Sequence, residues 1–197
     1  VRFDILTLFP EMIEGIINSS ILKRAIQKEI IEINIINFRD FSTNKHSTVD
    51  DYAYGGGAGM LISVEPIHKA LLTIPGYEKA TKILTSPSGK VFNQQMAIDL
   101  SKEEHIIIVC GHYEGIDNRI LNYMDEEISI GDYVLTGGEI PALTIVDAVS
   151  RLVKGVISDD STVQESFMSG LLEYPQYTRP EMFLDKKVPE VLLSRKS

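Results

Sequence analysis

The sequence contains a single cysteine, and this scarcity limits both its chemistry and its cellular setting. Cys110 has no second cysteine to pair with, which excludes an internal disulfide and fits a reducing cytoplasm. No apolar run reaches the roughly 20 residues of a membrane-spanning helix. The densest run, residues 30–36, is interrupted by Glu32 and Asn34. Asp4 lies inside the first apolar run, which favours a strand over a signal peptide. We therefore expect a cytoplasmic protein that makes no contact with a membrane.

Several common ligand-binding signatures are also missing. The four histidines show no metal-ligand spacing, and no Cys/His cluster exists. Residues 55–59 lack the Gly-Lys-Ser/Thr ending of a phosphate-binding loop, and neither they nor residues 131–138 spell G-x-G-x-x-G. These absences disfavour kinase, ATPase and dehydrogenase functions. The formal net charge of −9 argues against nonspecific nucleic-acid binding by the whole chain, but it does not exclude a local basic patch.

What is present is the pattern of a globular α/β protein. The chain has 197 residues, of which 44% are hydrophobic and 24% charged, so it can bury a core. Apolar runs predict strands at residues 3–9, 31–37, 81–85, 105–110 and 127–130. Helical periodicity predicts helices at residues 10–17, 21–29, 64–73, 93–100 and 142–154, with a short one ending near residue 123. Alternating strands and helices predict an α/β fold with a mostly parallel, layered sheet.

The most distinctive stretch is residues 129–142, with the sequence SIGDYVLTGGEIPA. It contains three glycines, which allow sharp turns or close approach of a ligand, and Pro141, which suits the first turn of a helix. A strand, a glycine-rich loop and a helix form a common ligand-binding arrangement in open α/β sheets. Glycine-containing loops at residues 86–89 and 111–115 follow two other predicted strands. Together the three loops could wrap a nucleoside-like ligand, although an ordinary connector is the alternative for each.

A second long segment, residues 38–59, has no regular pattern, and a loop of this length is typical of a functional site. Its His46 could bind a phosphate or a metal, or it could simply be exposed. Cys110 could be a nucleophile with His112 as its base, but a cysteine that closes an apolar strand is more often core. Arg151 follows Asp147 by four residues on a predicted helix, where a surface ion pair is the ordinary interpretation.

Five motifs, taken together and in this order, resemble one known family. They are LTLFPE at residues 6–11, VDDYAYGGGAGM at 49–60, CGHYEGID at 110–117, the stretch 129–142 and YTRP at 177–180. This set is similar to that of the bacterial tRNA (guanine-N1)-methyltransferases of the TrmD family, and the resemblance covers nearly the whole chain. It implies a SPOUT-type fold with a deep trefoil knot near the carboxyl side. It also implies S-adenosylmethionine as methyl donor, tRNA as partner and a homodimer whose active sites lie at the subunit interface.

The resemblance also implies roles for individual residues. Those expected to bind the donor are Leu84, Ser86, Pro87, Gly111, Ile130, Gly131, Asp132, Tyr133, Val134, Leu135, Gly137, Gly138 and Pro141. Glu114 matches a residue that contacts the target base, and Asp50 lies in a loop close to that base. The family requires a divalent cation such as Mg²⁺ for turnover, although no motif in this sequence identifies a metal site.

The expected chemistry needs one base and one cation. Guanine N1 is a poor nucleophile until it loses its proton, which a carboxylate within hydrogen-bond reach can accept. The negative charge that then develops on O6 is stabilised by a guanidinium. The resemblance assigns the guanidinium to Arg151. It places the base in a linker motif that here reads Glu165-Ser166-Phe167, with glutamate where the family has aspartate.

The expected layout has three parts. Residues 1–157 form the donor-binding domain, residues 158–170 a polar linker, and residues 171–197 the beginning of a helical tRNA-binding carboxyl-terminal domain that looks truncated. The expected function is methyl transfer to N1 of the guanosine 3′ to the anticodon. The alternatives are a catalytically incomplete, nucleoside-binding dimer module, or a SPOUT methyltransferase with another RNA target.

Overall fold

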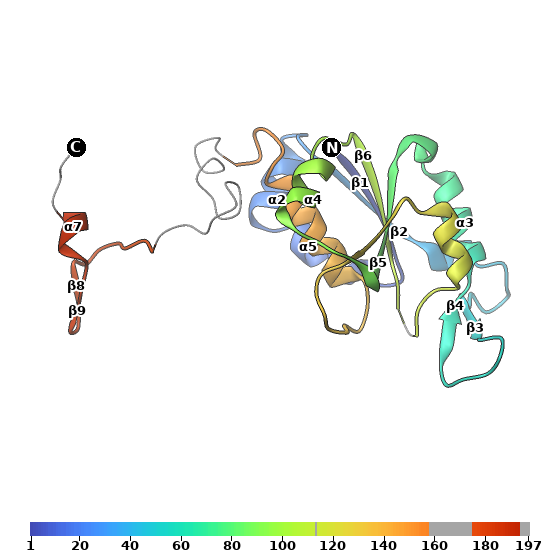
Figure 1. The fold of residues 1–197 in the computed structure, drawn as a ribbon. Coiled ribbons are helices and arrows are strands. Elements are labelled where there is room, and N and C mark those ends of the chain that lie inside the picture. The colour runs from blue at the N-terminus through green and yellow to red at the C-terminus, as the bar shows by residue number, and fades with distance from the viewer. Residues whose placement is uncertain (113, 158–174, 194–197) are drawn as a thin grey trace. The chain divides into compact units, whose positions relative to one another are not determined.

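The computed structural model describes residues 1–112, 114–157 and 175–193 (Figure 1). The chain divides into two compact units, Val1–Thr162 and Val163–Ser197. The predicted linker at residues 158–170, and with it Glu165, lies outside the described residues, so its predicted boundaries stay predictions.

The first unit is built on a five-stranded sheet that is parallel throughout, with strand order β2-β1-β6-β5-β7. Its strands are β1 Arg2–Thr7, β2 Glu32–Asn37, β5 Thr81–Val91, β6 His105–Cys110 and β7 Glu126–Ser129. The helices are α1 Pro10–Ile17, α2 Ser20–Gln27, α3 Val64–Thr73, α4 Gln94–Leu100 and α5 Glu139–Ser150. Short 3₁₀ helices are η1 Phe38–Phe41, η2 Tyr77–Lys79 and η3 Asn118–Tyr123. The predicted α/β fold with a mostly parallel sheet is confirmed.

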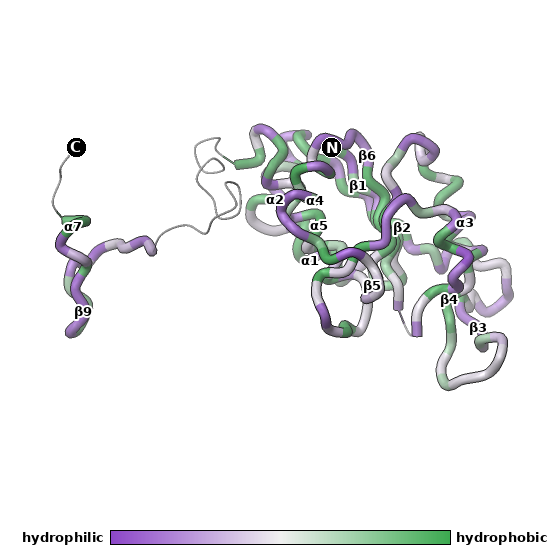
Figure 2. The backbone as a smooth tube through the Cα atoms, in the orientation of Figure 1, coloured by the Kyte–Doolittle hydropathy of each residue, from purple (hydrophilic) through white to green (hydrophobic). Residues whose placement is uncertain are grey.

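Helices cover both faces of the sheet, which explains why its central strand, β6, is almost wholly apolar. Helices α4 and α5 lie on one side and α3 on the other (Figure 1). In β6, Ile106 and Ile108 pack with residues of α1, α4 and α5, whereas Ile107 and Val109 pack with residues of α3. The hydropathy colouring of Figure 2 shows the apolar run of β6 in green. The cores on the two faces hold the carboxyl edge of the sheet in place.

Strand β5 continues beyond the predicted end of its strand. We predicted that it would stop at Thr85 and be followed by a turn at residues 86–89, but β5 extends to Val91. The pairing with β7 shifts between Thr85 and Lys90, so that both of these residues are opposite Ile128. Gly89 makes the second half of this pairing possible, because a Cβ there would lie 2.5 Å from the backbone of Glu127.

The segment at residues 38–59 is more regular than its sequence indicated. It begins with η1 and then contributes to a hairpin of β3 Asp50–Tyr52 and β4 Met60–Ile62. Buried Val49 and Ile62 fix the base of the hairpin in the core that lies beneath α3. The sequence around the glycine-rich turn at residues 55–59 did not indicate the short strands on either side of it.

Helix α5 confirms the predicted position of Pro141 in a first helical turn, but it ends at Ser150 and not at Lys154. Arg151 N–H still donates to Asp147, four residues back, whereas the N–H groups of Leu152 and Val153 donate to carbonyls three residues back. This change to 3₁₀ hydrogen bonding tightens the chain and ends the helix.

The second unit is described from residue 175 to residue 193. It contains a hairpin of β8 Met182–Phe183 and β9 Lys186–Lys187, followed by the short helix α7 Glu190–Leu193. Among the residues described in both units, no helix has the length and apolarity needed to cross a membrane.

The two-sided core predicts a large stability difference between two chemically identical substitutions. Ile108 is fully buried in β6, and Ile16 in α1 is 50% exposed. Ile108→Ala should lower the free energy of unfolding by about 2–5 kcal/mol, because it leaves a cavity. Ile16→Ala should change it by roughly 0.5 kcal/mol or less. Urea unfolding measures both, and equal losses would contradict the buried position of β6.

Candidate active site

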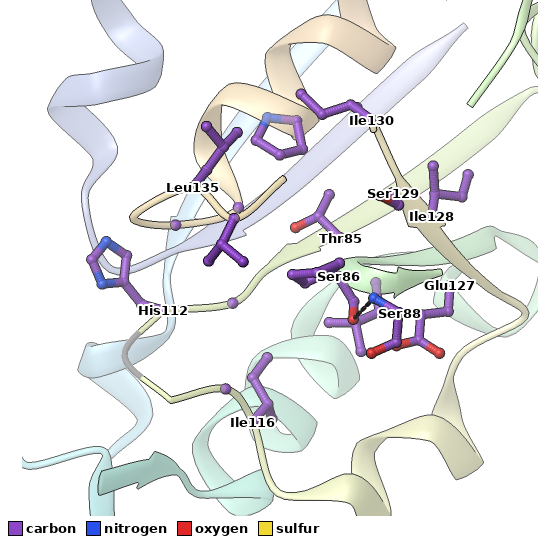
Figure 3. A pocket seen from close by; sticks show the side chains of 18 of the residues that line it. Thr85, Ser86, Ser88, His112, Ile116, Glu127, Ile128, Ser129, Ile130 and Leu135 are labelled. Carbon is purple, nitrogen blue, oxygen red and sulfur yellow. Dashed lines mark hydrogen bonds between the residues drawn. The ribbon is translucent and has the colours of Figure 1, made fainter. Parts of the chain in front are cut away.

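A pocket of about 430 Å³ lies at the carboxyl edge of β5, β6 and β7. Three segments supply most of its lining: residues 84–88, residues 111, 112 and 114–116, and residues 127–131 and 133–138 (Figure 3). Pro141 of α5 and three residues of η3 complete the wall. The volume is in the usual range for small-molecule sites, and the edge is the expected place for one in an open parallel sheet.

The loop after β7 is held by its own polar groups. The hydroxyl of Ser129 donates to the carbonyl of Gly131 at 3.0 Å and accepts from the N–H of Gly131 at 3.2 Å. The phenol of Tyr133 donates to the carbonyl of Ile130 at 3.2 Å. These bonds form a compact turn at the start of the loop.

The end of this loop packs directly against the end of β6. The N–H of Gly138 donates to the carbonyl of Gly111 at 2.8 Å, and Gly137 forms a bridge with His112. A Cβ at Gly138 would lie 2.8 Å from both Cys110 Cα and Gly111 N, and it would overlap the hydroxyl of Thr85. Only glycine fits here, because the neighbouring atoms belong to the backbone of a buried strand.

Most of the residues predicted to bind the donor line this pocket. Those in its lining are Leu84, Ser86, Pro87, Gly111, Ile130, Gly131, Tyr133, Val134, Leu135, Gly137, Gly138 and Pro141. Asp132 is not in the lining; its side chain is exposed in the loop.

Sequence reasoning missed part of the lining. The missed residues are Ile116, Asn118, Ile120, Leu121, Glu127 and Ile128. Others in the lining were not assigned individually but lie in the stretches predicted to hold the ligand: Thr85, Ser88, His112, Gly115, Ser129 and Thr136. Several of these lie beside motif residues at the strand ends, so strand position could have identified them. The residues of η3 come into the site only through tertiary packing, for which the sequence carries no local signal.

Of the two residues predicted to lie near the target base, Glu114 and Asp50, only Glu114 lines the pocket. Glu114 lines it and is exposed, and a Cβ at Gly59 in the β3–β4 hairpin would lie 2.9 Å from its carboxylate. Two backbone hydrogen bonds tie this hairpin to the pocket wall, from Ile62 N–H to Gly115 and from Asp117 N–H to Ile62. Asp50 begins β3 and is not part of the lining.

Arg151 is not brought to the pocket within this chain. It caps the carboxyl end of α5, whereas Pro141 reaches the pocket from the first turn of the same helix. At 1.5 Å per residue the two positions are about 15 Å apart along the helix axis. An arginine side chain is too short to span that separation.

Cys110 is a core residue and not a nucleophile. Its side chain is 1% exposed, and burial, with a smaller effect from the charge of Glu139, raises the pKa of the thiol well above its ordinary value. A buried thiol that stays protonated is unreactive. His46 lies exposed in its loop. Among the described residues, no three His, Cys, Asp or Glu side chains are grouped as metal ligands, so the divalent-cation requirement stays a prediction.

Comparison with known proteins identifies the family. The model of the tRNA (Guanine-1)-methyltransferase TrmD family matches residues 1–196. The chain belongs to the TrmD family.

Relatives named tRNA (guanine-N(1)-)-methyltransferase support this assignment. The one from Staphylococcus carnosus is 55% identical, over 98% of this chain and 80% of its own length. The one from Carboxydothermus hydrogenoformans is 59% identical, over 98% of this chain and 77% of its own. A crystal structure of the tRNA (m1G37) methyltransferase from Aquifex aeolicus is similar with a TM-score of 0.85 and 42% identity, covering 99% of this chain and 83% of that one.

In this TrmD-family chain the glycine packing predicts a sharp effect on binding of the methyl donor. Gly138→Ala should weaken S-adenosylmethionine binding at least tenfold, because the new Cβ pushes the loop off the end of β6. Gly15→Ala is the control, since nothing lies within 4 Å of a Cβ there and alanine favours helix α1. Isothermal titration calorimetry measures both. Unchanged donor affinity in Gly138→Ala would show that the loop does not hold the donor.

Proposed function

We propose that this chain transfers the methyl group of S-adenosylmethionine to N1 of the guanosine 3′ to the anticodon of tRNA. The observation that carries the proposal is the pocket at the carboxyl edge of the sheet, formed by family motifs in a chain that matches the TrmD family over residues 1–196. The similar structure from Aquifex aeolicus is named a tRNA (m1G37) methyltransferase, which supports the same target.

The donor binds in the pocket between residues 84–88, residues 111–116 and the loop after β7. The adenosine part is held mainly by backbone N–H and C=O groups, because glycines and apolar side chains dominate the lining. Side chains such as Leu135 and Ile116 border the pocket from two of these loops (Figure 3) and exclude water from the base. Bound donor supplies an electrophilic methyl group on a sulfonium.

Methyl transfer then needs only deprotonation and alignment of the acceptor. The carboxylate of Glu165 accepts the N1 proton of guanine as N1 forms a bond to the methyl carbon. The bond from that carbon to sulfur breaks at the same time, which leaves S-adenosylhomocysteine. Arg151 stabilises the negative charge that develops on O6. Glu114, at the rim of the pocket, and Asp50, in the adjoining hairpin, contact the target base.

The active chain is a homodimer in which each site combines two subunits. The separation of about 15 Å between Pro141 and Arg151 along α5 supports this, because one helix cannot deliver both ends to the same methyl group. In the dimer, Arg151 of one subunit faces the donor pocket of the other. Asp132, exposed in the donor loop, is available to the same interface.

The donor loop also forms the crossing of a deep trefoil knot. Strand β7 is at the edge of the sheet, whereas Gly138 hydrogen-bonds to Gly111 after β6, two strands further in. The chain therefore crosses the end of β5, whose own continuation packs against Glu127 through Gly89. This crossing, next to the close β5–β7 pairing at Gly89, supports a threaded path over a simple connection.

The dimer binds its tRNA in the cytoplasm. Residues 171–197 take part in tRNA binding. Lys186, which pairs with Asp185, and Lys187, which pairs with Glu181 and Glu190, exchange these carboxylates for tRNA phosphates. Mg²⁺ supports turnover as a divalent cation, a requirement that chelator treatment tests directly.

Mass spectrometry of tRNA incubated with the dimer and isotope-labelled S-adenosylmethionine tests the activity. Label should appear on N1 of the guanosine 3′ to the anticodon, and a tRNA without guanosine at that position should remain unlabelled. Label on another atom or nucleotide would favour a different RNA target. Donor binding without any label would favour a catalytically incomplete binding module.

The same assay tests the two catalytic assignments. Glu165→Gln and Arg151→Ala should each lower kcat by about 10²–10⁴-fold, the usual contribution of a general base or an oxyanion partner. Donor affinity should survive in both. Lys154→Ala is the matched control, because it removes an exposed positive charge three residues from Arg151. Loss of donor binding in either variant would assign it a structural role instead.

A further inference from the structure

Glu139 is a buried acid at the junction between the donor loop and α5. It is the first residue of the helix, follows Gly138 as N-cap, and is 1% exposed. Its charge suits a helix amino terminus, where the peptide dipoles favour an anion. Burial of a carboxylate is nevertheless expensive unless its oxygens have partners. Its position therefore needs an explanation beyond helix capping.

One carboxylate oxygen links the donor loop to the first strand. The hydroxyl of Thr7, the last residue of β1, donates to Glu139 Oε1 at 2.7 Å across 132 positions of sequence. The same hydroxyl accepts from the N–H of Phe9 at 2.9 Å, so the turn after β1 belongs to the link. Thr7 is fully buried.

The other oxygen lies against the donor loop. Among the residues that the structure describes, Oε2 of Glu139 has no hydrogen-bond partner although it is buried. A Cβ at Gly137 would lie 2.5 Å from this oxygen and 2.7 Å from Nε2 of His112. The carboxylate and the imidazole therefore share the space where a side chain of residue 137 would be.

His112 connects this buried group to the pocket. Its side chain borders the pocket (Figure 3), and its ring packs on Phe9 with centroids 4.5 Å apart. Gly137 and Gly138 also line the pocket, whereas Glu139 stands behind them and does not. Thr7 and Gly137 thus lie against one carboxylate directly behind the site, and Phe9 connects Thr7 to His112.

We propose that Glu139 is a positioning residue for the methyl donor. Its Oε1, fixed by Thr7, anchors the end of the donor loop to the end of β1. Its Oε2 is the acceptor for the imidazole N–H of His112 in the donor-bound state. The carboxylate thereby holds Gly137, Gly138 and His112 in the arrangement that binds the donor. This inference rests on the proposed function only in taking S-adenosylmethionine as the ligand of the pocket.

Calorimetric titration of S-adenosylmethionine into the 197-residue chain tests the proposal below the melting temperature of each variant. Glu139→Gln should weaken binding about tenfold, because an amide NH₂ cannot accept from the imidazole while its oxygen stays with Thr7. Thr7→Val, which keeps the shape but removes the hydroxyl, should weaken binding by a similar factor. Thr7→Ser restores the hydroxyl and should stay within about twofold of the unchanged chain.

Ser150→Ala is the matched control. Ser150 is a fully buried polar residue at the other end of α5, and its hydroxyl has no partner among the described residues. This variant should bind the donor as the unchanged chain does. In steady-state assays Glu139→Gln should raise the donor KM about tenfold and leave kcat at saturating donor unchanged, since a positioning residue acts on binding.

A role in stability alone gives a different result. It would lower the melting temperature of Glu139→Gln and Thr7→Val while the folded variants keep the donor affinity of the unchanged chain, and that outcome would overturn the proposal. If Glu139→Gln fails to fold, the donor affinities of Thr7→Val and Thr7→Ser distinguish a positioning role from a role in stability alone. Absence of donor binding by the unchanged chain would instead refute the proposed function.

Discussion

The backbone of Gly138 lies directly against the backbone of Cys110 and Gly111. This distance is too short for any residue with a Cβ at position 138. This contact fixes the loop after β7 to the end of β6 and so closes the pocket from one side. It also sets the start of α5, whose length separates the donor side of the site from Arg151. The pocket, the helix direction and the proposed need for a second subunit all depend on this one close approach.

The core of the sheet gives that contact its rigidity. Ile106 and Ile108 on one face and Ile107 and Val109 on the other hold β6 between two helical layers, so its end cannot shift to accommodate a larger residue. Buried polar groups, Thr7 and Glu139, extend the same rigidity from β1 to the helix. The proposed binding of the donor by backbone groups needs such a frame, because a loosely held loop would lose the geometry that backbone hydrogen bonds require.

The fold class and much of the pocket could be predicted from sequence, and the reasons are local. Residues 105–110 form a pure apolar run, which only a buried parallel strand explains well, and glycines 137 and 138 mark a close approach. The extension of β5 to Val91 could not be predicted, because it depends on pairing with β7 some 40 residues later. For the same reason sequence did not reveal that Glu139 meets Thr7, or that residues of η3 enter the pocket.

The central claim is that three loops at the carboxyl edge of the sheet hold the methyl donor. Hydrogen exchange measured by mass spectrometry, with and without S-adenosylmethionine, tests it most directly. The account predicts slower amide exchange at residues 84–88, 111–116 and 130–138, with no change in the remote helix α2. Protection confined to other segments, such as the β3–β4 hairpin, would contradict it, because the donor would then bind outside the pocket.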